Sequence, residues 1–322
     1  MKVAVCQVNP TVADLEGNVA LCLEAAKQAA LQHPDLIVFP ELALTGCHPK
    51  DILFDPGFVT AAWHALADFA ARSLDLQPVL IGTVLPAIDP TSQHPGLYNA
   101  AALVTDGDFR QVSAKRRLPG HDIYFEPRWF LPGPEPEAFE IGGSRVIALV
   151  GGELEAAASP PDADLVVALA ASPFVAGEGD ARQDILHAPG RSVVYVNLVG
   201  GSDDLIFDGG SFALDGDARL VGQIDRFSEQ IAIFDLSSEP VTIAKPDPLG
   251  QLYRALALGI RDFAAKNGIG HAFLGLSGGI DSSLVAVLAA EGLGPGRVTG
   301  VALPSRYTDP RSTEAAEQLA QI

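Results

Sequence analysis

The sequence predicts an α/β fold divided into two domains, and three observations support this. Short runs rich in β-branched residues recur between stretches with apolar residues at helical spacing. The segment 237–250 interrupts this alternation with three prolines, which favour extended backbone. Beyond it the expected order is helix, strand, glycine turn, helix and strand, which is typical of a parallel sheet. We therefore predict one domain over 1–240 and another over 241–322.

In the first domain the apolar runs are expected to be buried strands, because they are of strand length and lie between Gly- and Pro-rich loops. The expected strands are 2–8, 36–39, 79–84, 100–104, 146–150, 165–168, 193–197 and 231–234. The first helix is expected over 18–31, where apolar residues recur at helical spacing before His33-Pro34 stops the pattern.

The second domain begins a βαβ pattern. Its expected elements are helices over 252–266 and 282–291, strands over 272–276 and 298–303, and a final helix near the C-terminus. A domain of about 70 residues with two strands buries little of its sheet. We therefore expect a truncated Rossmann-like domain, and the chain to be a fragment of a longer protein.

The composition predicts a globular protein with an acidic surface. The chain has 322 residues, is 48% hydrophobic and carries a formal net charge of −19. This charge argues against nucleic acid as a partner, because phosphates attract basic surfaces. The apolar N-terminal run is too short for a signal peptide, and no apolar stretch reaches the roughly 18 residues that span a membrane. A cytoplasmic location without a membrane partner is therefore predicted.

The segment 275–283, Gly-Leu-Ser-Gly-Gly-Ile-Asp-Ser-Ser, has the most specific pattern. It joins an expected strand to an expected helix, so its glycines, hydroxyls and helix N-terminus can surround a phosphate. It lacks the Gly-Lys-Ser/Thr ending of a Walker loop. The alternative is an ordinary turn with Asp281 as a helix cap.

This segment resembles the PP-loop of ATP pyrophosphatases, a group with the adenine nucleotide α-hydrolase fold. The later segment 303–307, Leu-Pro-Ser-Arg-Tyr, is similar to NAD synthetases. The resemblance implies that Asp281 holds Mg²⁺, which neutralises phosphate charge. It also implies ATP contacts from Gly275, Leu276, Ser277, Gly278, Gly279, Ile280, Asp281 and Ser282.

The first domain resembles the nitrilase superfamily. The octapeptide 39–46, Phe-Pro-Glu-Leu-Ala-Leu-Thr-Gly, follows an expected strand and is close to that of the superfamily. Further similar segments are Leu97–Ala101, Lys115–Pro119, Ala171–Phe174, Tyr195–Asn197 and Phe207–Phe212. Within the last of these, Asp-Gly-Gly-Ser-Phe resembles the NAD synthetase branch. The resemblance covers 1–236 and implies an α-β-β-α sandwich.

The resemblance implies amide chemistry by Glu, Lys and Cys, in which a thiolate attacks the carbonyl, Glu moves the proton and Lys stabilises the oxyanion. Glu41 matches the base, Lys115 the cation, and Glu126 a second acid that supports the lysine. Gly151 stands where the cysteine is expected, after the strand 145–150. Because glycine has no side chain, we predict that this site cannot form an acyl-enzyme.

The resemblance also implies glutamine contacts at Ser172, His121 and Glu178. The family has a Tyr at the position of His121 and a Lys at that of Glu178. Replacing a cation by an anion reverses the attraction for a carboxylate substrate, a change on the order of kcal/mol at partly buried distances. Glutamine capture is therefore expected to be impaired as well.

Taken together, the chain resembles the glutamine-dependent NAD synthetase family. This implies amidation of deamido-NAD to NAD with ATP and Mg²⁺, release of AMP and pyrophosphate, and glutamine or ammonia as nitrogen donor. With its glutaminase half impaired, the chain is expected to be ammonia-dependent or incomplete. One alternative is a non-catalytic nitrilase-like scaffold or regulator, and another is a carbon-nitrogen hydrolase that uses a different nucleophile such as Cys47. A homo-oligomer is expected, since such domains usually assemble symmetrically.

Overall fold

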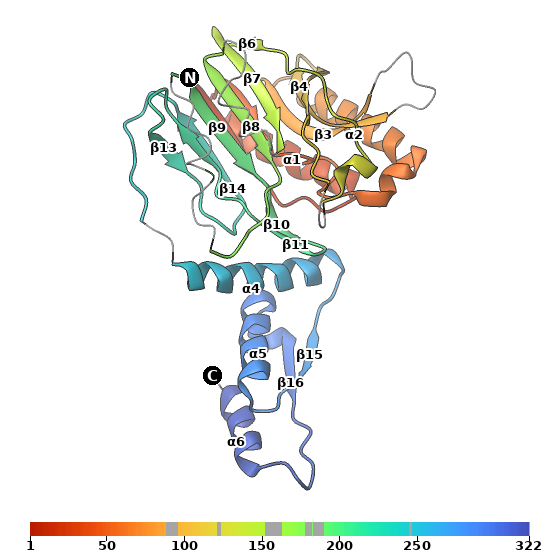
Figure 1. Ribbon diagram of the computed structural model, residues 1–322, viewed down its shortest axis with the longest axis vertical. Coiled ribbons are helices and arrows are strands. Elements are labelled where there is room, and N and C mark those ends of the chain that lie inside the picture. The colour runs from red at the N-terminus through yellow and green to blue at the C-terminus, as the bar shows by residue number, and fades with distance from the viewer. Residues whose placement is uncertain are drawn as a thin grey trace. The chain divides into compact units, whose positions relative to one another are not determined.

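The computed structural model describes residues 1–87, 96–120, 124–151, 163–177, 182, 190–244 and 247–321. The chain divides into two compact units, coloured along the sequence in Figure 1. The first unit comprises Met1–Gly200 and Phe207–Lys245, and the second comprises Gly201–Ile206 and Pro246–Ile322. Both units contain helices and β-sheets, and the two large sheets of the first unit are mixed, so the predicted α/β class is confirmed.

Two six-stranded sheets form the frame of the first unit. The first has the order β14-β1-β2-β3-β4-β5 and comprises β1 (Lys2–Gln7), β2 (Leu36–Val38), β3 (Val79–Ala87), β4 (Gly96–Thr105), β5 (Asp108–Ala114) and β14 (Gln230–Asp235). The second has the order β13-β12-β9-β8-β7-β6 and comprises β6 (Phe139–Ile141), β7 (Ser144–Val150), β8 (Leu165–Ala170), β9 (Ser192–Asn197), β12 (Phe212–Leu214) and β13 (Leu220–Gln223).

The two sheets share one pattern of strand directions. In the first, β1, β2 and β3 pair in parallel, and in the second, β7, β8 and β9 do the same. The strands outside these trios pair antiparallel. Active sites of parallel strands gather where the strands end, so the carboxyl ends of both trios are where functional side chains are expected.

Side-chain alternation along the strands separates three buried apolar clusters. In β1, Ala4 and Cys6 belong to a cluster shared with helices α1 (Leu15–Ala30) and α2 (Pro56–Arg72), whereas Val3 and Val5 belong to the cluster between the sheets. Ile147 of β7 belongs to a third cluster, formed by the second sheet. Both sheets are therefore apolar on both faces, as the continuous apolar runs predicted.

Helix α1 (Leu15–Ala30) begins earlier than the predicted range 18–31. The reason is a cap: the Asp14 carboxylate accepts a hydrogen bond from the Gly17 N–H at 3.0 Å. Helix α2 (Pro56–Arg72), capped by Asp55, was not predicted. The other short elements of this unit are the 3₁₀ turns η1 (Lys50–Phe54) and η2 (Glu126–Arg128) and the strands β10 (Val199–Ser202) and β11 (Leu205–Asp208).

The second unit contains one two-stranded parallel sheet. Its elements are α4 (Pro248–Lys266), β15 (Ala272–Gly275), α5 (Ile280–Leu293), η4 (Pro295–Arg297), β16 (Val298–Val301) and α6 (Pro310–Leu319). The prediction that the last strand reaches residue 303 is wrong, because its partner β15 ends at Gly275, opposite Val301. No helix among the described residues is long and apolar enough to cross a membrane.

Candidate functional site

Glu41 lies in the turn after β2, with 1% of its surface exposed. Its Oε1 accepts hydrogen bonds from Asn99 Nδ2 at 2.6 Å and from Lys115 Nζ at 2.8 Å. Its Oε2 accepts one from the backbone N–H of Ala171 at 2.9 Å. A side chain at Gly82 of β3 would come within 2.6 Å of the Glu41 Cα, so glycine lets this turn lie against the sheet. Groups from both sheets thus fix the carboxylate.

Lys115 directly follows β5 and is 5% exposed. Its backbone N–H donates to the Asn99 carbonyl at 2.8 Å, and its carbonyl accepts from the Gly133 N–H at 2.9 Å. Its Nζ donates to Glu41 Oε1 at 2.8 Å and to Glu126 Oε1 at 2.7 Å. One ammonium therefore lies between two buried carboxylates.

Glu126 opens the turn η2 and is fully buried. Its Oε2 has no hydrogen-bond partner among the residues that the structure describes. Burial raises the pKa of Glu126 to about 7; Lys115 acts in the opposite direction and Glu41 adds to the rise. Burial alone would lower the pKa of Lys115, but attraction to Glu41 and Glu126 raises it above its usual value. The lysine thus stays charged, while Glu126 can hold a proton near neutral pH.

Gly151 directly follows β7, with a φ of +73°, a left-handed conformation that favours glycine. A Cβ built there would overlap Cε of Lys115 and lie 2.7 Å from its Nζ. The lysine side chain therefore fills the space in which a side chain at position 151 would begin. The structure brings Glu41, Lys115 and Glu126 together beside a position that carries no functional group.

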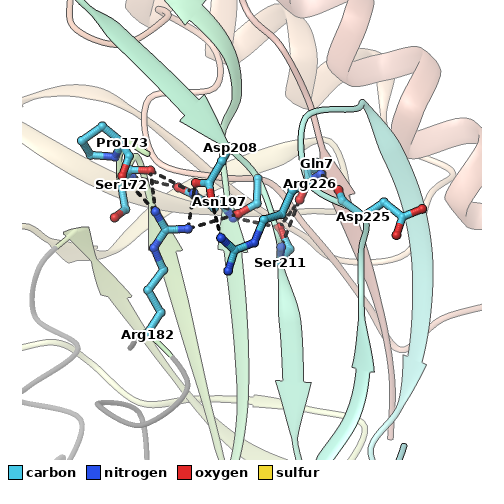
Figure 2. A network of polar contacts seen from close by, with 10 residues as sticks. Gln7, Ser172, Pro173, Arg182, Asn197, Asp208, Ser211, Asp225 and Arg226 are labelled. Atoms are coloured by element: carbon cyan, nitrogen blue, oxygen red, sulfur yellow. Dashed lines mark hydrogen bonds and ion pairs between the residues drawn. The ribbon is translucent and has the colours of Figure 1, made fainter. Parts of the chain in front are cut away.

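A second polar network holds the backbone next to Ala171. The N–H of Ser172 donates to Asn197 Oδ1 at 2.8 Å, and its carbonyl accepts from Asn197 Nδ2 at 3.0 Å. Arg182 donates to the Pro173 carbonyl at 2.9 Å, and Figure 2 shows these side chains converging on this stretch. Since Ala171 binds Glu41, the network fixes the backbone that orients the Glu41 carboxylate.

Asp208, at the end of β11, lies at the centre of this network. One of its oxygens is 2.8 Å from a guanidinium nitrogen of Arg182, and the other is 3.3 Å from one of Arg226. Ser211 donates to Gln7 Oε1 through its N–H at 3.0 Å and through its hydroxyl at 2.8 Å. The network thereby joins the end of β1 in the first sheet to the ends of β9 and β11.

No sequence pattern predicted a functional role for Asn99, Asn197 or Arg182. Asn99 and Asn197 lie within segments that are similar to the nitrilase superfamily, and this similarity could have pointed to a role for both residues. No pattern pointed to Arg182, because its partners are distant in the sequence. His121 and Glu178 lie outside the described residues.

Cys47 is buried near the same cluster, with 2% of its surface exposed. Burial raises the pKa of its thiol, and the nearby Glu41 carboxylate adds to the rise. The neighbouring His48 is also buried, which lowers its pKa to about 4. A neutral thiol beside a neutral imidazole is a poor nucleophile.

The Ser-Gly-Gly-Ile-Asp segment connects β15 to α5. The hydroxyl of Ser282 donates to the Gly279 carbonyl at 3.1 Å, and the Gly279 N–H donates to Ser277 Oγ at 3.3 Å. Gly278 has a φ of +77°, and a Cβ there would overlap the Ser312 carbonyl oxygen. Gly279 is the N-cap of α5, so Asp281 lies one residue inside the first turn.

The exposure of this loop suits a ligand site. Asp281 and Ser277 are exposed, and no side chain caps α5, which leaves the helix N-terminus accessible. Within the described part of the chain, no group of three or more His, Cys, Asp or Glu residues could hold a metal ion.

Both units match known protein families. Residues 2–245 match the Carbon-nitrogen hydrolase family. The chain belongs to this family. Residues 252–322 match the NAD synthase family. The family match spans the Glu41, Lys115 and Glu126 cluster and the network around Asp208.

Two relatives and two solved structures extend this comparison. The glutamine-dependent NAD(+) synthetase of Synechocystis is 36% identical over 99% of this chain and 62% of its own length, and that of Thermotoga maritima is 33% identical over 100% and 63%. The chain thus spans less than two thirds of these relatives. A glutamine-dependent NAD+ synthetase from Acinetobacter baumannii, solved with ADP, is 30% identical with a TM-score of 0.85 over 99% of this chain and 62% of that one. An amidase from Nesterenkonia is 25% identical with a TM-score of 0.60 over 73% of this chain and 89% of that one. These similarities confirm the nitrilase-like fold.

Proposed function

We propose that this chain is part of an NAD synthetase that amidates deamido-NAD with ATP and Mg²⁺, and that its own amidase site does not hydrolyse glutamine. In this proposal residues 1–240 are the amidotransferase-like domain and 241–322 are the start of the ATP-binding domain. Free ammonia, or ammonia made elsewhere, is the nitrogen donor. Gly151 is the observation on which the loss of glutaminase chemistry depends.

The cluster of Glu41, Lys115 and Glu126 could carry out only some of the steps of amide hydrolysis. Glu41 would move a proton and Lys115 would stabilise an oxyanion, but neither group can form the acyl intermediate. The Lys115 side chain also fills the space into which a Cβ at position 151 would project. The arrangement therefore supports a site that keeps the fold and the charged residues of an amidase but cannot form the acyl intermediate.

Cys47 is the alternative nucleophile, and its surroundings weigh against that role. The thiolate is the attacking form, but burial raises the pKa of this thiol. It is also 2% exposed, so a substrate could reach it only after the turn opens. We therefore propose Cys47 as a packing residue.

The loop before α5 supports the nucleotide part of the proposal. Gly275 through Ser282 would bind the phosphates of ATP through backbone N–H groups and hydroxyls, and Asp281 would hold Mg²⁺ on the phosphate oxygens. Mg²⁺ supplies charge neutralisation when bound. The chain's own contribution is the exposed N-terminus of α5, whose dipole favours an anion.

The first experiment measures ammonia released from glutamine by the chain, by Gly151→Cys, and by Gly151→Cys combined with Glu41→Gln. We expect no release from the wild type. Gain of activity in Gly151→Cys that Glu41→Gln removes supports a site that lacks only its nucleophile. Release by the wild type that a thiol-blocking reagent abolishes would instead establish a Cys47-type hydrolase.

A second experiment measures MgATP binding by calorimetry, with Asp281→Asn and Ser277→Ala as test variants and Asp204→Asn as an exposed control of equal charge change. We expect binding that both test variants weaken and the control does not. Absence of MgATP binding would favour the scaffold or regulator. Sedimentation of the same samples tests the proposed homo-oligomer.

A further inference from the structure

The second unit includes a short piece of chain that is distant in sequence from the rest of it. Gly201–Ile206 form the tip of the β10–β11 hairpin and belong to the second unit, whereas residues 200 and 207 belong to the first. The chain therefore passes between the units at three points, 200/201, 206/207 and 245/246. We call residues 201–206 the hairpin tip.

Both polar groups of one hairpin residue bind side chains of α4. The Gly201 N–H donates to Asp262 Oδ2 at 2.8 Å, and the Gly201 carbonyl accepts from Lys266 Nζ at 2.9 Å. Asp262 and Lys266 are four residues apart, so they lie on the same face of the helix. The Asp262 carboxylate thus accepts from the Gly201 N–H, and the Lys266 ammonium donates to the Gly201 carbonyl.

The acid in this contact is deeply buried. Asp262 is 3% exposed, and its other oxygen accepts from Arg261 Nε at 2.9 Å. Burying a carboxylate is unfavourable unless hydrogen bonds replace its hydration. Without the hairpin tip, Oδ2 would lose a charge-assisted hydrogen bond, so the helix face is built for this contact.

Glycines allow the two backbones to approach closely. A Cβ at Gly201 would lie 3.2 Å from the Gly259 Cα and 3.3 Å from the Asp262 Cβ. A Cβ at Gly259 would lie 3.1 Å from the Cδ1 of Ile206, also in the hairpin tip. Glycine within a helix is otherwise unfavourable by about 1 kcal/mol relative to alanine, which close packing offsets.

We propose that the Gly259, Asp262 and Lys266 face of α4 is a docking surface whose partner is the hairpin tip, and that this contact stabilises α4 within the second unit. The contribution requires a folded β10–β11 hairpin and no catalytic residue. It is therefore independent of the residue at position 151 and of what the second unit binds.

The test is amide hydrogen exchange of α4 in the full chain, comparing wild type with Asp262→Ala and Gly201→Val. Two substitutions provide the controls: Asp204→Ala, at an exposed position in the same hairpin, and Gly216→Val, where a Cβ meets nothing within 4 Å. We expect exchange in α4 to rise about tenfold or more in both test variants, as expected for losing a hydrogen bond to a charged group. The controls should exchange as the wild type does.

The substitutions are chosen so that they remove the contact without lowering the helix or strand propensity of the segment that carries them. Alanine is a better helix former than aspartate, and valine favours strands, so neither change weakens its own element. Both tryptophans, Trp63 and Trp129, lie in the first unit, so their fluorescence reports that unit alone during unfolding. We expect the tryptophan transition to stay unchanged while α4 exchanges faster.

Two results would overturn the proposal: α4 exchange in Asp262→Ala and Gly201→Val that stays within about twofold of the wild type, or a tryptophan transition that shifts as much as α4 does. If either variant does not fold, Lys266→Met removes only the donor to the Gly201 carbonyl while keeping the apolar stem. Faster α4 exchange in Lys266→Met supports the docking surface, and wild-type exchange contradicts it.

Discussion

At Glu126, burial and charge act in opposite directions, and burial dominates. The pKa of this carboxyl is raised from 4.5 to about 7 even though the Lys115 ammonium is 2.7 Å away. Between these two pH values the folded protein keeps the proton that the unfolded chain has lost. Stability from this group is therefore complete below about pH 4.5 and is lost as pH rises to about 7.

We expect Glu126→Gln to remove that pH dependence, since an amide cannot ionise. The free energy of unfolding of the wild type should fall relative to the variant between pH 5 and pH 8, as measured by urea titration with tryptophan fluorescence. Glu140→Gln, at an exposed position in β6, is the control and should follow the wild type. Parallel pH curves for wild type and Glu126→Gln would show that Glu126 ionises normally in the fold.

Gly151 provides a second prediction at this scale. Gly151→Ala should destabilise the first unit by about 1–2 kcal/mol for the left-handed backbone, and further because the new methyl overlaps Lys115. Gly143→Ala is the matched control, because Gly143 has a φ of +81° and a Cβ there meets nothing within 4 Å. The difference between the variants in urea unfolding measures the overlap, and equal losses would mean that Lys115 moves away freely.

Among the elements, the ends of the strands decide how the site is held. Asn197 ends β9 and binds both backbone groups of Ser172 together with the Gly209 carbonyl, at 3.1 Å. One side chain therefore ties together the chain at the ends of β8, β9 and β11. A buried amide in such a position is fully satisfied only when all of these segments are in register.

Replacing Asn197 with leucine gives a similarly branched but larger apolar side chain and removes these bonds. The Ser172 N–H would lose its partner, while the Ser172 and Gly209 carbonyls would keep only their Arg182 contacts at 3.4 and 3.5 Å. A buried group without a partner costs about 1–3 kcal/mol, so we expect a loss of that size in the free energy of unfolding. Tryptophan-monitored urea unfolding measures it. Asn267→Leu, at an exposed position at the end of α4, should leave this transition unchanged. A loss under about 1 kcal/mol would show that water replaces the asparagine.

At the scale of the whole molecule, the two units differ in how much they bury. Every residue of β8 is buried, whereas no residue of β15 or β16 is. Large apolar side chains of the second unit are exposed, including Phe273 at 73% and Ile280 at 84%. A partly open pocket of about 410 Å³ lies beside Leu276. Burial is the main stabilising contribution, so the second unit should be the less stable one.

Hydrogen exchange of the wild-type chain should therefore proceed in two steps. We expect the amides of β15 and β16 to exchange well before those of β8 and β9, because opening a poorly buried strand takes less free energy. Mass spectrometry of the exchanged peptides measures this directly. Protection of β15 equal to that of β8 would contradict the difference in stability between the units.

The α/β class, most strand positions and the lack of a side chain at position 151 could be predicted from the sequence, because they follow from local periodicity and residue identity. Short continuous apolar runs predicted β1 and β7, and a glycine at position 151 excludes a thiolate there in any fold. Helix and strand ends were less predictable: β16 ends early because pairing with β15 runs out, which depends on the partner strand.

Contacts between residues that are far apart in the sequence could be seen only in the folded chain. The Lys115 side chain fills the space beside Gly151, Asn197 ties the backbone next to Glu41, and the hairpin tip at Gly201 belongs with α4. No periodicity encodes these contacts, because each joins segments that are far apart in the sequence. Packing and hydrogen-bond satisfaction in the folded chain bring them together.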